Sequence, residues 1–363
     1  MKIVHVVEPF ASGIAAFVQS IVQNLRDDFH IIIHGEREYV MNSAEIKQFF
    51  PKDNVQFIRW QSAQRNLSLV KDTAALVELC RLLKNLKQQK MVDAVHLHSS
   101  KSGFLGRLAC KLIDISNVIY TPNGAPFMLS NIKAINLFYK LFEKLGSTFG
   151  GRVVCCSRSE TEAYRKLGIR ALTINNGIAV KVSSTQTVIP AKSSKFRILT
   201  CARIVPQKNP ALFNAIATCF KDFGQFEFVW VGDGEERHQL TSPNIKITGW
   251  LTPPEALKLI TSSNLYLSTS QYEGLSFSVL EALALKKTVL LKDCIGNRDI
   301  VKKGLNGDLF HNAQEAVVKI FQYYNNPDML HVMGEYSMSL CHTEFNVNDT
   351  CSLYRSLYQR TKA

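Results

Sequence analysis

The chain has 363 residues, of which 46% are hydrophobic and 20% charged, a balance that suits two globular domains and excludes a disordered chain. The formal net charge is +13, and residues 1–180 carry 23 Lys/Arg against 14 Asp/Glu. This excess favours a polyanionic or phosphorylated partner, although solubility alone could also explain it. No run of eighteen or more uncharged apolar residues occurs, so we expect no transmembrane helix.

The N-terminus and the cysteines indicate the compartment. The apolar stretch of MKIVHVVEPF is short and Glu8 interrupts it, so we expect no signal peptide. The nine cysteines are scattered without CxxC pairs, which fits a reducing cytosol. Cys155 and Cys156 lie in a strand-like run and are expected to be buried thiols.

Short apolar runs alternate with helical patterns along the chain. Strands are expected at 2–7, 30–35, 55–60, 94–99, 117–122, 152–157, 172–177, 196–203, 226–232, 245–250, 265–270 and 288–292, and helices at 15–27, 73–89, 209–223 and 278–287. This alternation predicts an α/β fold with parallel sheets covered by helices on both faces. The polar segment 182–195 suits a linker.

We therefore expect two doubly wound domains, at 1–182 and 195–340, followed by a helix within 341–363. Open α/β sheets bind ligands at the carboxyl ends of their strands, so an active site in a cleft between the domains is the expectation.

Residues 130–150 place apolar side chains at helical spacing with lysines among them. Such a basic amphipathic helix could lie in a membrane interface. The alternative is a helix packed on the sheet with its lysines outward. The residues concerned are Ile132, Ile135, Phe138, Leu141, Phe142 and Leu145, with Lys133, Lys140 and Lys144.

The segment ILTCARIVPQKNP at 198–210 carries two cations after a strand. Asn209 suits a helix cap and Pro210 the first helical turn, so Arg203 and Lys208 should lie beside a helix N-terminus. That arrangement favours binding of a diphosphate. The alternative is a solvated basic loop.

Glycines follow the next two strands. FVWVGDGEE holds Gly232 and Gly234, and ITGW holds Gly249. A GxG without its third glycine is weak support for a dinucleotide fold, but a tight turn lets a ligand approach the backbone. A base or sugar could lie there, and ordinary turns are the alternative.

The segment QYEGLSFSVLEALALKK at 271–287 holds Glu273 and Glu281 with seven residues between them. A helix beginning near Ser276 would turn its free N–H groups toward Glu273 and favour an anionic or hydroxyl-rich ligand. Glu273 could accept hydrogen bonds from sugar hydroxyls and Glu281 from both ribose hydroxyls. Otherwise both are surface charges, the usual place of glutamate.

In order and spacing, ARIVPQKNP, WVGDGE, TGW and EGLSFSVLE resemble the retaining GT-B glycosyltransferases of family 4 (glycosyl transferases group 1), whose signature is E-x7-E. The resemblance covers nearly the whole chain and implies two Rossmann-like domains facing a cleft. It implies that Arg203 and Lys208 stabilise the leaving diphosphate, and that Glu273 contacts the donor sugar and Glu281 the ribose. The donor-binding set it implies also includes Gly232, Gly234, Gly249, Gly274 and the amides of Leu275, Ser276 and Phe277.

The N-terminal half resembles the same family. EPFASGIAAFVQSIV is similar to its glycine loop, which implies that Gly13 binds the donor diphosphate, although Gly13 stands alone where two glycines are usual. HLHSSKSGFLGRLA is similar to a segment of O-antigen and exopolysaccharide transferases, which implies that His98 and Lys101 face the cleft near the donor sugar or acceptor. In YTPNGAPF, Asn123 stands where the family often has a histidine beside the donor sugar. The resemblance therefore implies that Asn123 lies on the sugar side of the site, where its amide could take over that contact but could not act as a general base.

The residues themselves suggest a simpler role for the two strand histidines. Alternation on a strand predicts one core and one exposed side chain for His96 and His98, and no third metal ligand is evident nearby.

The resemblance implies a retaining, metal-independent hexosyl- or N-acetylhexosaminyltransferase without a cofactor. Its donor would be a nucleotide-diphosphate sugar, UDP before GDP, and its acceptor a lipid-linked (polyprenyl-diphosphate) glycan of O-antigen, capsule or exopolysaccharide. We expect a peripheral enzyme on the cytoplasmic face of the plasma membrane, with the C-terminal helix crossing back to the first domain.

Three alternative functions remain as hypotheses. A UDP-N-acetylglucosamine 2-epimerase shares two facing Rossmann-like domains but gives no reason for E-x7-E. A non-catalytic sugar- or nucleic-acid-binding module could use the basic surface, yet no RNP-like segment is present and no nucleic-acid partner is expected. An NAD dehydrogenase lacks GxGxxG after the first strand.

Overall fold

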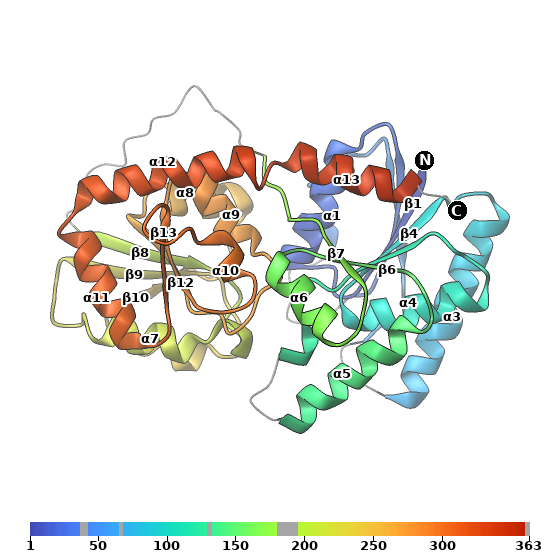
Figure 1. The fold of residues 1–363 in the computed structure, drawn as a ribbon, viewed down its shortest axis with the longest axis horizontal. Coiled ribbons are helices and arrows are strands. Elements are labelled where there is room, and N and C mark those ends of the chain that lie inside the picture. Colours follow the sequence, from blue (N-terminus) through green and yellow to red (C-terminus); the bar gives the residue numbers. More distant parts are fainter. Residues whose placement is uncertain (37–42, 65–67, 129–132, 180–194, 360–363) are drawn as a thin grey trace. The chain divides into compact units, whose positions relative to one another are not determined.

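Two parallel β-sheets account for the fold (Figure 1). The computed structural model describes residues 1–36, 43–64, 68–128, 133–179 and 195–359. The chain divides into two compact units, one formed by Met1–Asn176 with Val347–Ala363 and the other by Gly177–Asn346. Below they are called the N-terminal and the C-terminal unit.

The N-terminal unit has a seven-stranded parallel sheet of order β3-β2-β1-β4-β5-β6-β7. Its strands are β1 (Lys2–Val7), β2 (Phe29–His34), β3 (Val55–Arg59), β4 (Ala94–His98), β5 (Val118–Thr121), β6 (Arg152–Cys155) and β7 (Ala171–Thr173). Its α-helices are α1 (Ser12–Asn24), α2 (Ser43–Lys47), α3 (Leu69–Gln88), α4 (Ser100–Leu112), α5 (Lys133–Ser147), α6 (Arg158–Lys166) and α13 (Val347–Gln359), with a 3-10 turn at Pro126–Met128.

The C-terminal unit has a six-stranded parallel sheet of order β10-β9-β8-β11-β12-β13. Its strands are β8 (Phe196–Cys201), β9 (Phe226–Val231), β10 (Ile245–Ile247), β11 (Leu265–Ser268), β12 (Thr288–Lys292) and β13 (Gly307–Phe310). Its α-helices are α7 (Pro210–Thr218), α8 (Pro253–Thr261), α9 (Phe277–Ala284), α10 (Asn297–Ile300), α11 (Ala313–Tyr324) and α12 (Pro327–Thr343). Two 3-10 turns cover Pro206–Lys208 and Arg237–Gln239.

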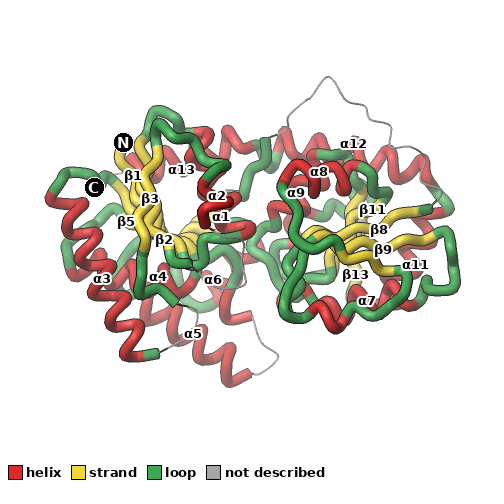
Figure 2. The backbone as a smooth tube through the Cα atoms, turned by 180° about the vertical axis from the view of Figure 1, so that it is seen from behind, coloured by secondary structure: helices red, strands yellow, loops and turns green. Residues whose placement is uncertain are grey.

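Helices lie on both faces of each sheet (Figures 1 and 2). Most strands are nearly continuous apolar runs with both faces buried, whereas the edge strands β3, β7 and β10 are partly exposed. In each sheet the strand order reverses once, between β1 and β4 and between β8 and β11. The predicted fold class, two doubly wound parallel sheets, is confirmed, and the cleft expected between the domains stays a prediction.

The expected domain limits at 182, 195 and 340 also stay predictions. Residues 180–194 lie outside the described part of the chain, and α12 spans position 340. The last helix, α13, packs on the N-terminal unit, where Asn117 Nδ2 and Arg152 Nη2 donate to the carbonyls of Tyr358 and Leu357 at 2.7 Å each. Within the described ranges, no helix has both the length and the apolarity that crossing a bilayer requires.

All nine cysteines are free thiols, and Cys155 and Cys156 are fully buried as predicted.

Candidate active site

The loop after β8 carries the two predicted cations. Asn209 adopts a left-handed conformation (φ 52°), which asparagine tolerates better than most residues, and its side chain accepts a hydrogen bond from Leu212 N at 3.3 Å. The chain therefore reverses directly before α7, with Pro210 in the first turn. The predicted cap is confirmed, and Lys208 lies immediately before the helix N-terminus.

Lys208 and Glu273 form an ion pair, with Nζ 2.5 Å from Oε1. Only 17% of the Lys208 side chain and 8% of the Glu273 side chain are exposed, so both charges are largely removed from water. Thr269 Oγ1 donates to Lys208 O at 2.7 Å and Gln271 N to Gln207 O at 2.9 Å. The loops after β8 and β11 are thus fastened together, and two residues given separate roles by the sequence are direct partners. Arg203 lies partly buried in the first of these loops.

Backbone packing explains two of the predicted glycines. A Cβ on Gly232, whose φ is +132°, would lie 2.2 Å from Ala202 O, and one on Gly234 would lie 2.3 Å from Ile204 O. Gly232 N also donates to Gly249 O at 3.1 Å. These glycines let the end of β9 pass closely against the loop that holds Arg203, so they position the cation loop whether or not a ligand approaches them.

Helix α9 begins at Phe277 with Ser276 as its N-cap, which confirms the predicted helix start. Glu273 N donates to Ile295 O at 3.0 Å, and the side chain of Leu275 is buried. Sequence reasoning missed Gly296, whose φ is +85° and whose added Cβ would lie 2.7 Å from Gly274 O and 2.8 Å from Glu273 O. Only a glycine lets this chain segment pack so closely beneath Glu273 and Gly274.

Glu281 lies in the second turn of α9, and burial raises the pKa of its carboxyl to about 7. Its charge in turn contributes to the raised pKa values of Cys201 and Tyr266, so these three groups are neighbours. A carboxylate in this position needs a hydrogen-bond donor to carry its charge. That a ligand supplies this donor to Glu281 stays a prediction.

The raised pKa gives a testable pH dependence. A carboxyl whose pKa is higher in the folded than in the unfolded state leaves the free energy of unfolding unchanged at low pH. It destabilises the folded state progressively as pH rises from about 4.5 to about 7. We expect Glu281→Gln to match the wild type in free energy of unfolding near pH 4 and to exceed it by on the order of 3 kcal/mol at pH 8. Denaturant unfolding across that range checks this, and a constant difference would contradict it.

In the N-terminal unit, the first turn of α1 leaves open space over Gly13, where an added Cβ would meet nothing within 4 Å. Lys101, in α4, forms an ion pair with Asp72 of α3 at 2.6 Å, and both side chains are largely buried. Whether Gly13 and Lys101 contact a ligand stays a prediction.

The side chain of Asn123 forms hydrogen bonds within the N-terminal unit. Its φ is 58°, its Nδ2 donates to Thr121 O at 3.2 Å, and its Oδ1 accepts from Cys156 Sγ at 3.4 Å. The buried carboxylate of Glu160, which the sequence did not single out, accepts from Gly124 N at 2.7 Å and from Cys156 N at 2.8 Å. Glu160 therefore fixes this loop to the end of β6.

The prediction of one core and one exposed histidine on β4 is wrong, because residues two apart on a strand point to the same face. His96 and His98 are both fully buried. The view that a third metal ligand is missing is also wrong, since His5 of β1 brings a ring nitrogen within 4.8 Å of theirs. His96 contacts the hydroxyls of Tyr358 and Thr121, at 2.8 Å each.

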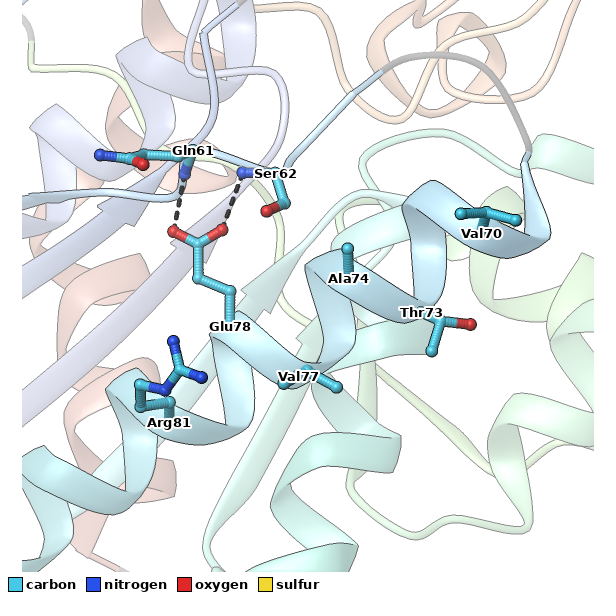
Figure 3. A pocket seen from close by; sticks show the side chains of 8 residues that line it. All are labelled: Gln61, Ser62, Val70, Thr73, Ala74, Val77, Glu78 and Arg81. Atoms are coloured by element: carbon cyan, nitrogen blue, oxygen red, sulfur yellow. Dashed lines mark hydrogen bonds between the residues drawn. The ribbon is translucent and has the colours of Figure 1, made fainter.

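An open groove lies elsewhere on the N-terminal unit, along α3 (Figure 3). Glu78 accepts there from Gln61 N at 2.9 Å and Ser62 N at 2.7 Å. Partial burial opposes ionisation, but the hydrogen bonds from Ser62 and Gln61 prevail and lower the pKa of Glu78. None of the predicted site residues lines this groove, so it is not the candidate active site.

Two family models match the chain in succession. A glycosyl transferase 4-like domain matches residues 12–177, and glycosyl transferases group 1 matches residues 184–339. Together they span most of the sequence. The chain belongs to this glycosyltransferase family. The membership favours a transferase over the epimerase, the dehydrogenase and the binding module.

Curated relatives and solved structures agree with this family. The glycosyltransferase is 28% identical over 320 residues, 81% of each chain, to the UDP-Gal:alpha-D-GlcNAc-diphosphoundecaprenol alpha-1,3-galactosyltransferase of Escherichia coli. It is 25% identical over 256 residues, 63% of its length and 65% of the relative's, to the N,N'-diacetylbacillosaminyl-diphospho-undecaprenol alpha-1,3-N-acetylgalactosaminyltransferase of Campylobacter jejuni.

Two similar structures cover the whole glycosyltransferase and show that the fold is GT-B. Sucrose-phosphate synthase of Thermosynechococcus elongatus is 15% identical, with a TM-score of 0.79 and 99% of each chain covered. Anabaena Alr3699/HepE in complex with UDP and glucose is 18% identical, with a TM-score of 0.77 and coverage of 99% and 100%.

Proposed function

We propose that this glycosyltransferase moves a hexosyl or N-acetylhexosaminyl group from a UDP-sugar to a polyprenyl-diphosphate-linked glycan, in the synthesis of O-antigen, capsule or exopolysaccharide. The observation that carries the donor side is the Lys208–Glu273 pair, held beside the starts of α7 and α9. The names of the Escherichia coli and Campylobacter jejuni relatives support a diphosphate-linked lipid acceptor, and the former supports a UDP-sugar.

The proposed chemistry begins with an exchange of partners. The donor diphosphate takes Lys208 and Arg203, and Glu273, freed from Lys208, accepts a hydrogen bond from a hydroxyl of the donor sugar. The bond between the anomeric carbon and the diphosphate oxygen then breaks, and the two cations stabilise the negative charge on the leaving group. The acceptor hydroxyl bonds to the same face of the sugar and gives its proton to the leaving phosphate. Configuration is retained, and the step requires no metal ion.

The first experiment is a thermal-shift panel of UDP, GDP, CMP, ADP and their common sugars, without added metal and then with EDTA. A ligand that binds the folded state alone raises the melting temperature. We expect a rise with UDP and UDP-sugars that EDTA does not change. A rise confined to another nucleotide, or one abolished by EDTA, would contradict the proposed donor or the metal independence.

Helix α5 supports a peripheral contact with the membrane. One of its faces packs on α4, where the rings of Phe142 and Phe104 stack at 3.9 Å and Arg107 pairs with the buried Glu143 at 3.3 Å. Another face exposes 40–59% of each of five apolar residues, with Lys144 also exposed. These are Ile135, Leu137, Phe138, Leu141 and Leu145, whereas residues 130–132 of the predicted helix lie outside the described chain.

The two sequence interpretations, a helix in the membrane interface and a helix packed on the protein, therefore each describe one face of α5. We propose that its exposed apolar face lies in the cytoplasmic surface of the plasma membrane.

Leu137→Glu with Leu141→Glu is expected to abolish co-sedimentation with anionic vesicles, because two charges would enter the apolar layer. The matched control is Val332→Glu with Leu353→Glu, which charges two equally exposed residues on α12 and α13. Equal binding by the two double variants would exclude α5 as the contact.

A further inference from the structure

A row of histidines crosses one face of the N-terminal sheet, from β2 through β1 to β4. His5 Nε2 lies 3.1 Å from His30 Nδ1, and His5 Nδ1 lies 3.1 Å from His98 Nε2. The rings stack, with centroids 5.3 Å and 5.4 Å apart. All three side chains are fully buried, so their hydrogen bonds do not exchange with solvent. We call these three residues the histidine row.

The row ends at a group that can only accept. His30 Nε2 lies 3.1 Å from the carbonyl oxygen of Leu25, so this nitrogen must carry the proton. Burial lowers the pKa of all three imidazoles, to about 3 for His98, which leaves each ring neutral with a single N–H. His30 Nδ1 must then accept from His5 Nε2, and His5 Nδ1 from His98 Nε2. The Leu25 carbonyl therefore fixes the tautomer of His98, three hydrogen bonds away.

In this tautomer, Nδ1 of His98 carries a lone pair that nothing in the described chain satisfies. The atom is buried and has no hydrogen-bond partner there. The same holds for Oγ of Ser99, the next residue, whose φ of 72° is unusual for a residue other than glycine. Unmet buried polar atoms cost free energy, and strained backbone concentrates at functional sites. Both residues lie at the carboxyl end of β4, where the strand order reverses and open α/β sheets bind ligands.

We propose that His30 and His5 are positioning residues that hold His98 in the Nε2–H tautomer, so that its Nδ1 accepts a hydrogen bond from a sugar hydroxyl and rejects a phosphate oxygen. An unprotonated phosphate oxygen is itself an acceptor and repels a second lone pair. The class of ligand rests on the proposed function, whereas the tautomer rests only on the hydrogen bonds of the N-terminal unit. The opposite tautomer would place an N–H at the same point and would favour phosphate.

The tautomers are measured directly by NMR of the full-length protein with 15N-labelled histidine. At pH 7 we expect a pyridine-type Nδ1 and a pyrrole-type Nε2 for each member of the row, assigned by single substitutions among the nine histidines. An N–H on Nδ1 of His98, or signals averaged between two tautomers, would overturn the proposal. So would stoichiometric zinc in the purified protein with the nitrogen signals shifted by a metal, because the row would then be a ligand set.

Two substitutions of His30 separate positioning from packing. His30→Phe fills the space without polar atoms and is expected to abolish the single tautomer of His98. His30→Gln offers an amide oxygen toward His5 and an amide N–H toward Leu25, and is expected to preserve it. Identical His98 signals in the two variants would contradict the proposal, and the wild-type spectrum decides the tautomer even if His30→Phe does not fold. His238→Phe, at an exposed position of the C-terminal unit, is the control.

The ligand is tested on the wild-type protein with two probes. Dimethyl phosphate, a phosphate diester that carries no P–O–H at pH 7, should leave the Nδ1 signal of His98 unmoved. A non-transferable UDP-sugar analogue added with a soluble sugar-diphosphate acceptor should shift it. A shift with dimethyl phosphate, or none with the sugar ligands bound, would overturn the hydroxyl assignment. These signals do not depend on turnover, so a failure of the proposed transferase activity would remain distinguishable from a failure of the tautomer.

Discussion

Arg203→Ala combined with Lys208→Ala is expected to lower kcat of transfer at least about a hundredfold, because fixed charges of this kind contribute roughly 3–4 kcal/mol each to a transition state. The cations are needed most when the sugar–oxygen bond breaks and charge develops on the diphosphate. Single-turnover transfer from a saturating UDP-sugar measures this step, so weaker donor binding does not obscure it.

A matched control removes the same net charge elsewhere in the C-terminal unit. Lys246 pairs with Glu227 at 2.5 Å and Lys286 pairs with Glu335 at 2.8 Å, and both lysine side chains are exposed. Lys246→Ala with Lys286→Ala should leave kcat within about twofold, because Glu227 keeps Arg197 as a partner at 2.7 Å and the exposed Lys286–Glu335 pair contributes little. A loss below tenfold in the Arg203/Lys208 variant, or an equal loss in the control, would refute the leaving-group role.

Glu273→Gln should abolish measurable transfer while UDP binds as tightly as before or more tightly. The substitution keeps the shape of the side chain but removes the charge that holds Lys208 at 2.5 Å. Lys208 is then available to the diphosphate without first leaving a carboxylate, whereas the sugar loses a charged hydrogen-bond acceptor. Calorimetric titration with UDP and a transfer assay on the same sample separate the two effects.

Because Glu273 pairs with Lys208, its substitution could also reduce transfer by loosening the loops that the pair joins, and this alternative needs a separate test. If Glu273 only held the loops after β8 and β11 together, Glu273→Gln would weaken UDP binding and lower the unfolding midpoint, and transfer would fall in proportion. Glu335→Gln, which breaks the exposed pair with Lys286, serves as the reference for loss of one carboxylate. Unchanged turnover in Glu273→Gln would exclude the sugar-contact role outright.

The sequence predicted most strands because strands buried on both faces are continuous apolar runs. It missed β13, whose sequence GDLF contains a glycine and an aspartate. Gly307 is required there because an added Cβ would lie 1.8 Å from Val289 O, and Asp308 is satisfied by the hydroxyl of Tyr323 at 2.8 Å. The glycine and the aspartate of β13 are thus explained by contacts with other segments of the chain. A local sequence pattern carries no information on such contacts, so it could not predict this strand.

The same limit applies to the candidate site. The capping of α7 by Asn209 and Pro210 was predictable because it depends on adjacent residues. The pairing of Lys208 with Glu273, 65 residues away, depends on β8 and β11 being neighbours in the sheet. The histidine row likewise requires the order β2-β1-β4, which places His5 between His30 and His98.

The N-terminal unit is discontinuous in the sequence, and this constrains its biosynthesis. Tyr354 and Tyr358 of α13 stack near His96 and contact Thr121 and His96 through their hydroxyls, but they are made after the whole C-terminal unit. One face of the first sheet therefore lacks α13 until residues 347–359 leave the ribosome, so the unit that begins first is completed after the C-terminal unit. A fragment that ends at residue 176 is consequently an unfinished domain, and the C-terminal unit is the half of the enzyme with an uninterrupted chain.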